Sequence, residues 1–198
     1  METKTNAKIP SEMDEKMALA VLDVAGAPAQ AARLVQPGDT VVIIGAGGKS
    51  GTLCMYEARK RAGVSGQVIG LGHSKAGCDR MKSLGWADHV LQVDATNAVA
   101  VMEAVAEVTG GKMADLTINC VNVPGTEMSS IMATRDLGKI YFFSMATSFT
   151  AAALGAEGVG KDVEMIIGNG YAKDHAQIAL SLLRESEQLR KLFEELYV

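Results

Sequence analysis

Short apolar runs and segments of helical period follow one another along most of the chain. Six runs have the near-continuous apolar pattern of strands buried on both faces: 40–44, 67–71, 89–93, 116–121, 139–143 and 163–167. Segments with apolar positions three and four residues apart predict helices: 52–61, 75–84, 97–108, 126–133, 173–183 and 185–196. The stretch from Ser144 to Lys161 is predicted to be a long connection.

This alternation predicts the fold class. Strands that alternate with helices favour a parallel sheet with helices on both faces. Right-handed crossovers and two such halves give an α/β fold with a doubly wound, parallel six-stranded sheet in the order 3-2-1-4-5-6, the Rossmann fold. We expect a single domain over residues 13–198, preceded by a polar tail over residues 1–12.

Two helices are predicted ahead of the first strand. Ser11 is the expected N-cap of the first, with Glu12 and Asp14 in its first turn and an apolar stripe that ends at Gly26-Ala27-Pro28. A second, short helix is predicted over 29–34. These helices lead directly into the first strand of the sheet.

A glycine-rich turn follows the first strand and precedes a helix. That order of elements presents backbone N–H groups and a helix N-terminus to a phosphate. The candidate cofactor-binding residues in the turn are Gly45, Gly47, Gly48, Lys49, Ser50 and Gly51. A glycine turn taken alone is also compatible with a tight turn that binds nothing.

Spacing separates two phosphate motifs that this turn resembles. Gly48-Lys49-Ser50 is similar to the end of an ATP-binding P-loop, but that motif requires a glycine where the chain has Ile43. The strict G-x-G-x-x-G fingerprint fails at its third glycine, whereas Gly45-x-x-Gly48-x-x-Gly51 supplies a turn glycine and a packing glycine. A dinucleotide, NAD or NADP, is therefore favoured over a nucleoside triphosphate.

The loop after the second strand bears on which dinucleotide is bound. This position usually carries an acidic residue that holds the ribose hydroxyls, and the chain has Gly72 there, followed by His73, Ser74 and Lys75. These three polar residues suit a 2′-phosphate, which favours NADP or a tolerance of both cofactors. The alternative is a polar loop in which Ser74 merely caps the next helix.

Further candidates are assigned from their position after a strand. Asp94 is expected beside the adenine, Asn122 beside the ribose on the nicotinamide side, and Ser144, Met145 and Asn169 beside the nicotinamide amide. Asp94 and Asn122 are equally compatible with ordinary loop and turn roles. No general base or nucleophile has a convincing setting, and no set of residues has the spacing of a metal site.

Composition narrows the class of partner. The 19 basic and 23 acidic residues give a net charge of −4 without a basic block, which argues against nucleic acid. No apolar run reaches the length of a membrane span and the start has no signal-peptide core, so we expect no membrane and a cytoplasmic protein. Cys54, Cys78 and Cys120 are expected to be small buried hydrophobes in a reducing compartment.

The sequence from Val35 to Gly48 resembles the entry to the cofactor domain of the medium-chain dehydrogenases/reductases. The loop at Gly72 is similar to that of NADP-using alcohol dehydrogenases of this superfamily, which carry Gly-Ser-Arg there. The chain lacks that arginine, so the choice of cofactor stays open.

A closer resemblance, over about residues 14–197, is to the L-erythro-3,5-diaminohexanoate dehydrogenase family. It rests on the segments 18–30, 119–122, 141–149 and 168–171. The resemblance implies oxidative deamination of a β-amino acid in lysine fermentation, with a nicotinamide cofactor usually described as NAD.

That resemblance leaves two hypotheses. Members of the superfamily place a catalytic domain before the cofactor domain, so we expect the catalytic residues, and contact with a small amino-acid substrate, to depend on a domain joined to this one. The alternative is a stand-alone dinucleotide-binding module with no catalysis of its own. In either case the last strand, 163–167, is an expected sheet edge, and we predict a homodimer that pairs through it.

Overall fold

The computed structural model describes residues 9, 11, 13–168 and 170–198. Within them, six strands form one sheet in which every neighbouring pair is parallel, in the order β3-β2-β1-β4-β5-β6. The strands are β1 (Thr40–Ile44), β2 (Gln67–Gly72), β3 (His89–Gln92), β4 (Ala114–Asn119), β5 (Thr134–Phe142) and β6 (Glu164–Ile167). The predicted fold class and strand order are confirmed.

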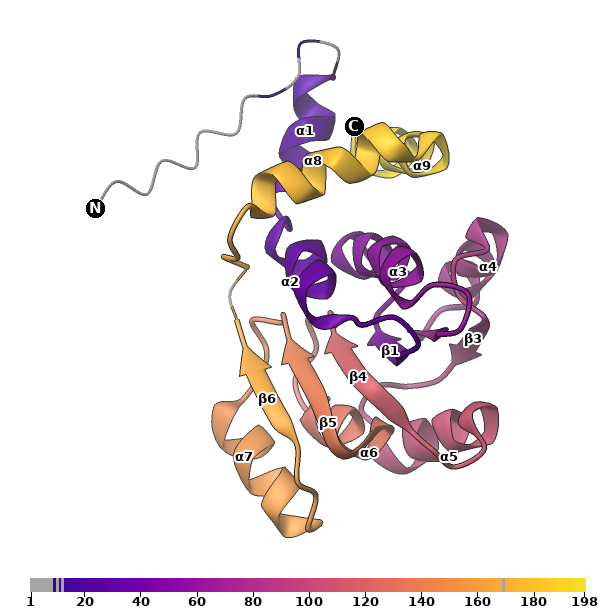
Figure 1. Cartoon of the computed structure of the whole chain (residues 1–198), viewed down its shortest axis with the longest axis vertical. Coiled ribbons are helices and arrows are strands. Elements are labelled where there is room, and N and C mark those ends of the chain that lie inside the picture. Colours follow the sequence, from indigo (N-terminus) through magenta and orange to yellow (C-terminus); the bar gives the residue numbers. More distant parts are fainter. Residues whose placement is uncertain (1–8, 10, 12, 169) are drawn as a thin grey trace, which may run out of the picture.

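Helices cover both faces of the sheet (Figure 1). One face carries α2 (Gly26–Leu34), α3 (Lys49–Ala62) and α4 (Lys75–Leu84), and the other carries α5 (Ala98–Thr109), α6 (Glu127–Ala133) and α7 (Phe149–Gly158). The remaining helices form an outer layer over α2 and α3: α1 (Glu15–Leu22), α8 (His175–Glu185) and α9 (Glu187–Tyr197).

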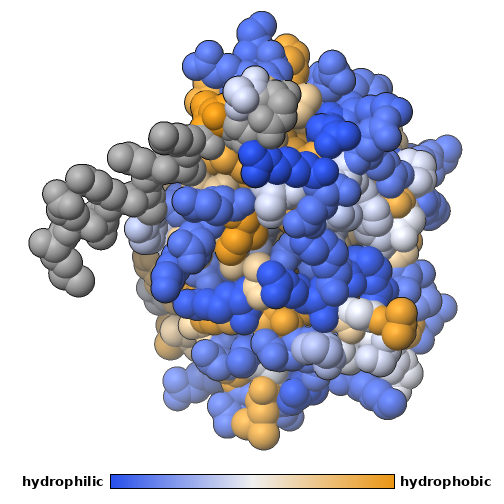
Figure 2. Space-filling model, turned by 45° about the horizontal axis from the view of Figure 1, so that its top comes forward, coloured by the Kyte–Doolittle hydropathy of each residue, from blue (hydrophilic) through white to orange (hydrophobic). Residues whose placement is uncertain are grey.

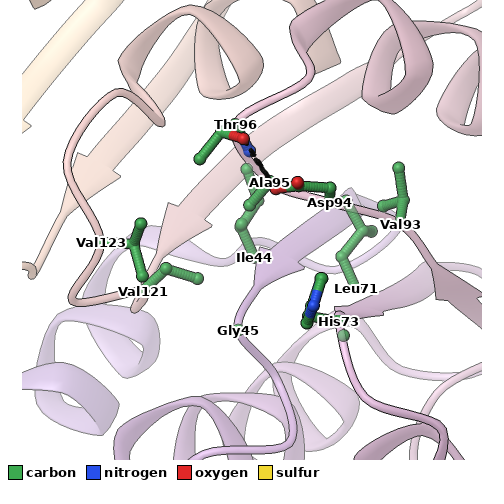
Figure 3. A pocket seen from close by; sticks show the side chains of 11 residues that line it. Ile44, Gly45, Leu71, His73, Val93, Asp94, Ala95, Thr96, Val121 and Val123 are labelled. Atoms are coloured by element: carbon green, nitrogen blue, oxygen red, sulfur yellow. Dashed lines mark hydrogen bonds between the residues drawn. The ribbon is translucent and has the colours of Figure 1, made fainter.

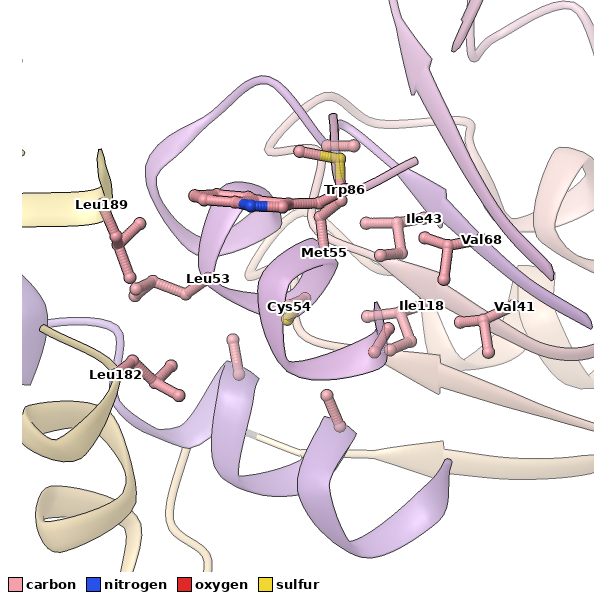
Figure 4. Close-up of a cluster of buried hydrophobic side chains, with 14 of the residues drawn as sticks. Val41, Ile43, Leu53, Cys54, Met55, Val68, Trp86, Ile118, Leu182 and Leu189 are labelled. Atoms are coloured by element: carbon pink, nitrogen blue, oxygen red, sulfur yellow. The ribbon is translucent and has the colours of Figure 1, made fainter. Parts of the chain in front are cut away.

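The central strand explains the near-continuous apolar pattern. Side chains alternate between the two faces of a strand. Val41 and Ile43 of β1 pack in the cluster beneath α3, which Figure 4 shows, while Val42 and Ile44 pack in the cluster beneath α5. All four are fully buried. Because helices cover both faces of β1, neither face of this strand is polar. β1 lies between β2 and β4 in the sheet, which fixes the position of its carboxyl end.

The start of the first helix and the connection after the fifth strand differ from the prediction for local reasons. Helix α1 begins at Glu15, not after Ser11, because the Asp14 carboxylate accepts a hydrogen bond from the Met17 N–H at 3.1 Å and caps the helix. The connection from Ser144 to Lys161 contains α7, capped by Ser148. Only two small residues of α7, Ala152 and Ala156, are buried, so its apolar stripe was too weak to be recognised.

None of the helices in the described ranges is long and apolar enough to cross a membrane. On the face shown in Figure 2, hydrophobic residues form separate small patches between hydrophilic ones. The predicted polar tail falls mostly on residues outside the described ranges.

Candidate functional site

The glycine turn (Gly45–Gly51) connects the carboxyl end of β1 to the N-terminus of α3. Gly45 has φ +81°, and a Cβ on Gly51 would lie 2.1 Å from the Gly45 carbonyl oxygen. The turn therefore closes only with glycine at both positions. Gly48 caps α3 without a side-chain hydrogen bond. The first N–H groups of a helix have no partner within it, so the backbone amides of Lys49, Ser50 and Gly51 form a donor set for an anion.

One side of the turn opens on an apolar cavity of about 290 Å³, shown in Figure 3. It lies at the carboxyl ends of β1 and β2, and the loops after β3 and β4 close it. Its lining residues are Ile44, Gly45, Leu71, Gly72, His73, Val93, Asp94, Ala95, Thr96, Val121 and Val123. This mostly aliphatic slot suits a flat apolar group such as a base.

Asp94 shapes one wall of the apolar cavity. Its Oδ1 accepts hydrogen bonds from the Thr96 N–H at 2.9 Å and from the Thr96 hydroxyl at 2.8 Å, the contact drawn in Figure 3. These two bonds hold the pKa of the Asp94 carboxyl below its ordinary value. The carboxylate is therefore charged at neutral pH and fixes the loop after β3.

A second cavity, of about 250 Å³, lies on the other side of the turn. Its lining residues are Gly45, Gly47, Gly48, Gly72, His73, Ser74, Gly77 and Arg80. The two cavities share Gly45, Gly72 and His73, so they form a continuous surface around the end of β2. Ser74 Oγ accepts the Gly77 N–H at 3.1 Å and caps α4.

Arg80 is a member of this second cavity that the sequence analysis missed. Its Nη2 donates to the Gly47 carbonyl at 3.3 Å, and its Nε is buried with no hydrogen-bond partner among the described residues. The contact between Arg80 and Gly47 forms because the glycine turn crosses close to α4. A Cβ added to Gly47 would lie 3.4 Å from the carbonyl oxygen of Gly77 in that helix. A charged residue on an amphipathic helix gives no sequence signal of such a crossing.

A third cavity, of about 480 Å³, lies at the carboxyl ends of β5 and β6. Ser144 and Met145 line it, together with Thr147, Phe149, Ile167 and Gly168. The loop is held in place from the neighbouring element, because the buried Glu127 carboxylate accepts the Ser148 N–H at 2.7 Å.

The loop after β4 is anchored by a buried amide. Asn119 Nδ2 donates to the hydroxyls of Thr126 and Ser130, each at 2.9 Å, and its Oδ1 accepts the Val121 N–H at 3.0 Å. All of these polar groups are satisfied inside the protein. They hold Val121 against the apolar cavity.

The structure leaves several predicted side chains away from these cavities. Lys49 directs its ammonium to Asp23, at 2.7 Å, and over the ring of Tyr197, so only its backbone faces the turn. Lys75 is highly exposed and lies 3.5 Å from Asp79. Asn122 is exposed and lines none of the three cavities. Asn169 lies outside the described residues.

Within 13–168 and 170–198, no group of three or more histidines, cysteines or acidic residues could hold a metal ion. The described site is suited to binding: an anion at the start of α3, a flat group in the apolar cavity, and a further polar group around the end of β2.

The comparisons with known proteins agree with this geometry. The profile of the family described as zinc-binding dehydrogenase matches residues 51–185, well over half of the chain. L-erythro-3,5-diaminohexanoate dehydrogenases of Acetoanaerobium sticklandii and Fusobacterium nucleatum are 55% and 51% identical over 197 residues. Each alignment covers 100% of this chain and 57% of the relative, so the chain spans little more than half the length of these relatives.

Solved structures share the fold at low sequence identity. AibC has a TM-score of 0.72 at 20% identity over 90% of this chain and 52% of its own. Mycobacterial Rv1454c complexed with NADPH has a TM-score of 0.68 at 18% identity over 97% and 57%. A putative alcohol dehydrogenase from Thermotoga maritima has a TM-score of 0.66 at 24% identity over 88% and 45%.

The family profile and the two relatives confirm the predicted membership of the medium-chain dehydrogenases. The chain belongs to the zinc-binding dehydrogenase family.

Proposed function

We propose that the chain binds NAD or NADP across the glycine turn and forms the cofactor part of a dehydrogenase that oxidatively deaminates 3,5-diaminohexanoate. The observation that carries the proposal is the N-terminus of α3, which no side chain caps and which opens between two cavities. A dinucleotide fits this arrangement, because its diphosphate meets the helix N-terminus while its adenosine end lies at the two cavities around the end of β2.

The proposed contacts follow the edge of the sheet. The adenine occupies the apolar cavity beside Asp94, and the diphosphate accepts hydrogen bonds from the backbone N–H groups of Lys49, Ser50 and Gly51. The other end extends towards the loops after β4, β5 and β6, with Asn122, Ser144, Met145 and Asn169 as the proposed neighbours of the nicotinamide. The bound cofactor supplies a hydride acceptor at the nicotinamide ring.

The end of β2 favours acceptance of NADP as well as NAD. A Cβ at Gly72 would lie 2.8 Å from Met81 Cε and 3.1 Å from Cys78 Sγ, so a larger residue at this position requires these two side chains to shift. Gly72 itself brings no carboxylate that would repel a 2′-phosphate, and His73 and Ser74 line the adjoining cavity. Lys75 begins α4 directly after this loop and brings positive charge next to it, although it lies outside the cavity and 3.5 Å from Asp79.

Titration of fluorescence from NADPH and NADH tests this choice. We expect Lys75→Ala to weaken NADPH binding several-fold and to leave NADH binding within about twofold, since a lysine contributes charge to the phosphate alone. Lys112→Ala, an exposed lysine in the turn after α5, is the matched control. Equal loss for both cofactors would contradict a role for Lys75 at the 2′ position.

The proposed substrate is tested by turnover. The substrate needs residues from a domain joined to this one, since positioning supplies much of the rate of an enzyme. We expect 3,5-diaminohexanoate to reduce NAD rapidly with the chain joined to such a domain, and very slowly with the present chain alone. Cofactor binding without turnover in either form would favour the alternative, a stand-alone dinucleotide-binding module.

We also propose a homodimer that pairs through β6. In the described sheet, β6 is an edge strand that pairs with β5 alone, and its last residue, Ile167, is 40% exposed. An exposed edge presents unpaired backbone groups to a second chain. Analytical ultracentrifugation at micromolar concentration tests this, and a monomer throughout would overturn it.

A cytoplasmic location is proposed because the three cysteines are free.

A further inference from the structure

Two cysteine thiols meet beside the candidate site, on the face of the sheet that α3 covers. The Sγ atoms of Cys120, directly after β4, and Cys54, in α3, lie 3.9 Å apart although 66 positions separate the residues. Cys54 is buried among the side chains shown in Figure 4, and Cys120 is partly exposed. Cys78 lies elsewhere, with its Sγ 3.7 Å from the Gly72 carbonyl oxygen.

The charged groups that act on this cluster are the Glu57 carboxylate, on the Cys54 thiol, and the Arg33 guanidinium, on the nearby Tyr141 hydroxyl. The Tyr141 hydroxyl interacts electrostatically with both thiols and is buried without a hydrogen-bond partner among the described residues. Burial, with a smaller effect of Cys120, raises the pKa of the Cys54 thiol. Cys54 is therefore a poor first nucleophile, and the partly exposed Cys120 is the thiol that an oxidant reaches.

We propose that Cys54 and Cys120 form a reversible disulfide and that its formation weakens dinucleotide binding at the glycine turn. A disulfide has an S–S distance of about 2.05 Å, so the two sulfurs must approach each other by roughly 1.9 Å. Side-chain rotation together with a small shift of the chain after β4 closes this distance. The effect on binding rests on the proposed function, whereas the disulfide itself does not.

A peroxide supplies the oxidising equivalents. The Cys120 thiolate attacks one peroxide oxygen, the O–O bond breaks, and sulfenic acid and one water form from hydrogen peroxide. The Cys54 sulfur then attacks the Cys120 sulfur, the S–O bond breaks, and the hydroxyl leaves with the thiol proton as a second water. Two thiols and one hydrogen peroxide thus give one disulfide and two waters.

The backbone around Cys120 links this reaction to the site. The Cys120 N–H donates to the Ile44 carbonyl at 2.9 Å, and the next residue, Val121, lines the apolar cavity. Val121 packs closely against Gly45, because a Cβ added to Gly45 would lie only 2.7 Å from Val121 Cγ2. Cys54 is one turn along α3 from the end of the glycine turn. A disulfide therefore pulls on both segments that frame the apolar cavity.

Thiol mapping tests the disulfide without reference to any ligand. The whole chain is treated with hydrogen peroxide, unfolded, alkylated and digested without reductant. We expect alkylation of Cys78 alone and a linked pair of peptides that carry Cys54 and Cys120, which dithiothreitol separates. Cys78→Ser should retain the linked pair, whereas Cys54→Ala and Cys120→Ser should abolish it. The proposal would be overturned if Cys120 were overoxidised while Cys54 stayed a free thiol. It would also be overturned if the disulfides formed only between two chains.

Titration with NADH then tests the effect on binding. We expect the oxidised chain to bind at least about fivefold more weakly than the reduced chain, the lower range of coupling between linked sites, and dithiothreitol to restore the affinity. Peroxide should not change the affinity of Cys54→Ala, which cannot form the bond. If a chain that is shown to carry the disulfide binds NADH with unchanged affinity, the proposed effect of the disulfide on binding is overturned. A reduced chain that binds no dinucleotide would instead refute the proposed function, while the thiol map stays interpretable.

Discussion

Substitution of Gly51 by alanine is the sharpest perturbation of the glycine turn. Gly51 lies in the first turn of α3, and its Cα faces the backbone of Gly45 and Ala46 rather than a flexible side chain. A Cβ at position 51 would lie 2.1 Å from the Gly45 carbonyl oxygen and 2.7 Å from the Ala46 Cα. Ordinary contact begins at 3.4 Å, so the turn has to retreat from α3 by about 1.3 Å.

Two costs follow from this retreat. Overpacking of a tight contact destabilises a protein by about 1–3 kcal/mol. The retreat also misplaces the backbone amides at the start of α3, and a hydrogen bond to a charged group is worth about 1.5–3 kcal/mol. Loss of one such bond weakens the dinucleotide affinity by roughly 10- to 150-fold. The loss of affinity should therefore be larger than the loss of stability alone would suggest.

The assay pairs urea unfolding with titration of NADH. Gly158→Ala is the matched control, because a Cβ at Gly158, at the end of α7, has no atom within 4 Å. We expect the control to keep its affinity and to change the free energy of unfolding by less than about 0.5 kcal/mol. A folded Gly51→Ala variant that binds NADH within twofold of the parent would refute the proposed role of the turn.

Three further substitutions test separate parts of the structure. Lys49→Ala should leave the NADH dissociation constant within twofold, because the ammonium pairs with Asp23, and a tenfold loss would show that the side chain reaches the phosphate. Gly26→Ala should lower stability by about 1–3 kcal/mol in urea unfolding, since its Cβ would lie 2.0 Å from the Gly170 Cα; unchanged stability would contradict that packing. Asn119→Ala should lower the free energy of unfolding by about 1–3 kcal/mol, because hydroxyls and an amide lose their buried partner, and a neutral result would show that water replaces it.

The sheet was predictable because its signals are local and redundant. The run at β1 is apolar on both faces, which is typical of a strand in a parallel sheet between two helix layers. The glycine turn was equally clear, since Ile43 excludes a P-loop and the spacing of the three glycines indicates a dinucleotide turn. Local pattern therefore gave the architecture and the centre of the proposed site.

Contacts between distant segments were not predictable from that pattern. Arg80 reaches the second cavity only because the glycine turn crosses α4, and Cys54 meets Cys120 only because α3 packs beside the end of β4. For Lys49, the place in a glycine turn suggests that the side chain contacts a phosphate, whereas in the structure its ammonium pairs with Asp23. Tertiary packing decides these positions, and a single sequence does not encode them in any local signal.

We propose above all that a dinucleotide binds with its diphosphate at the start of α3. Backbone amide chemical shifts, recorded by NMR with increasing NADH, test it most directly. We expect the largest changes at residues 47–51, accompanied by changes at Asp94 and Val121. Shifts confined to other surfaces, such as the groove between α4 and α9, or no shift at saturating NADH, would contradict the account.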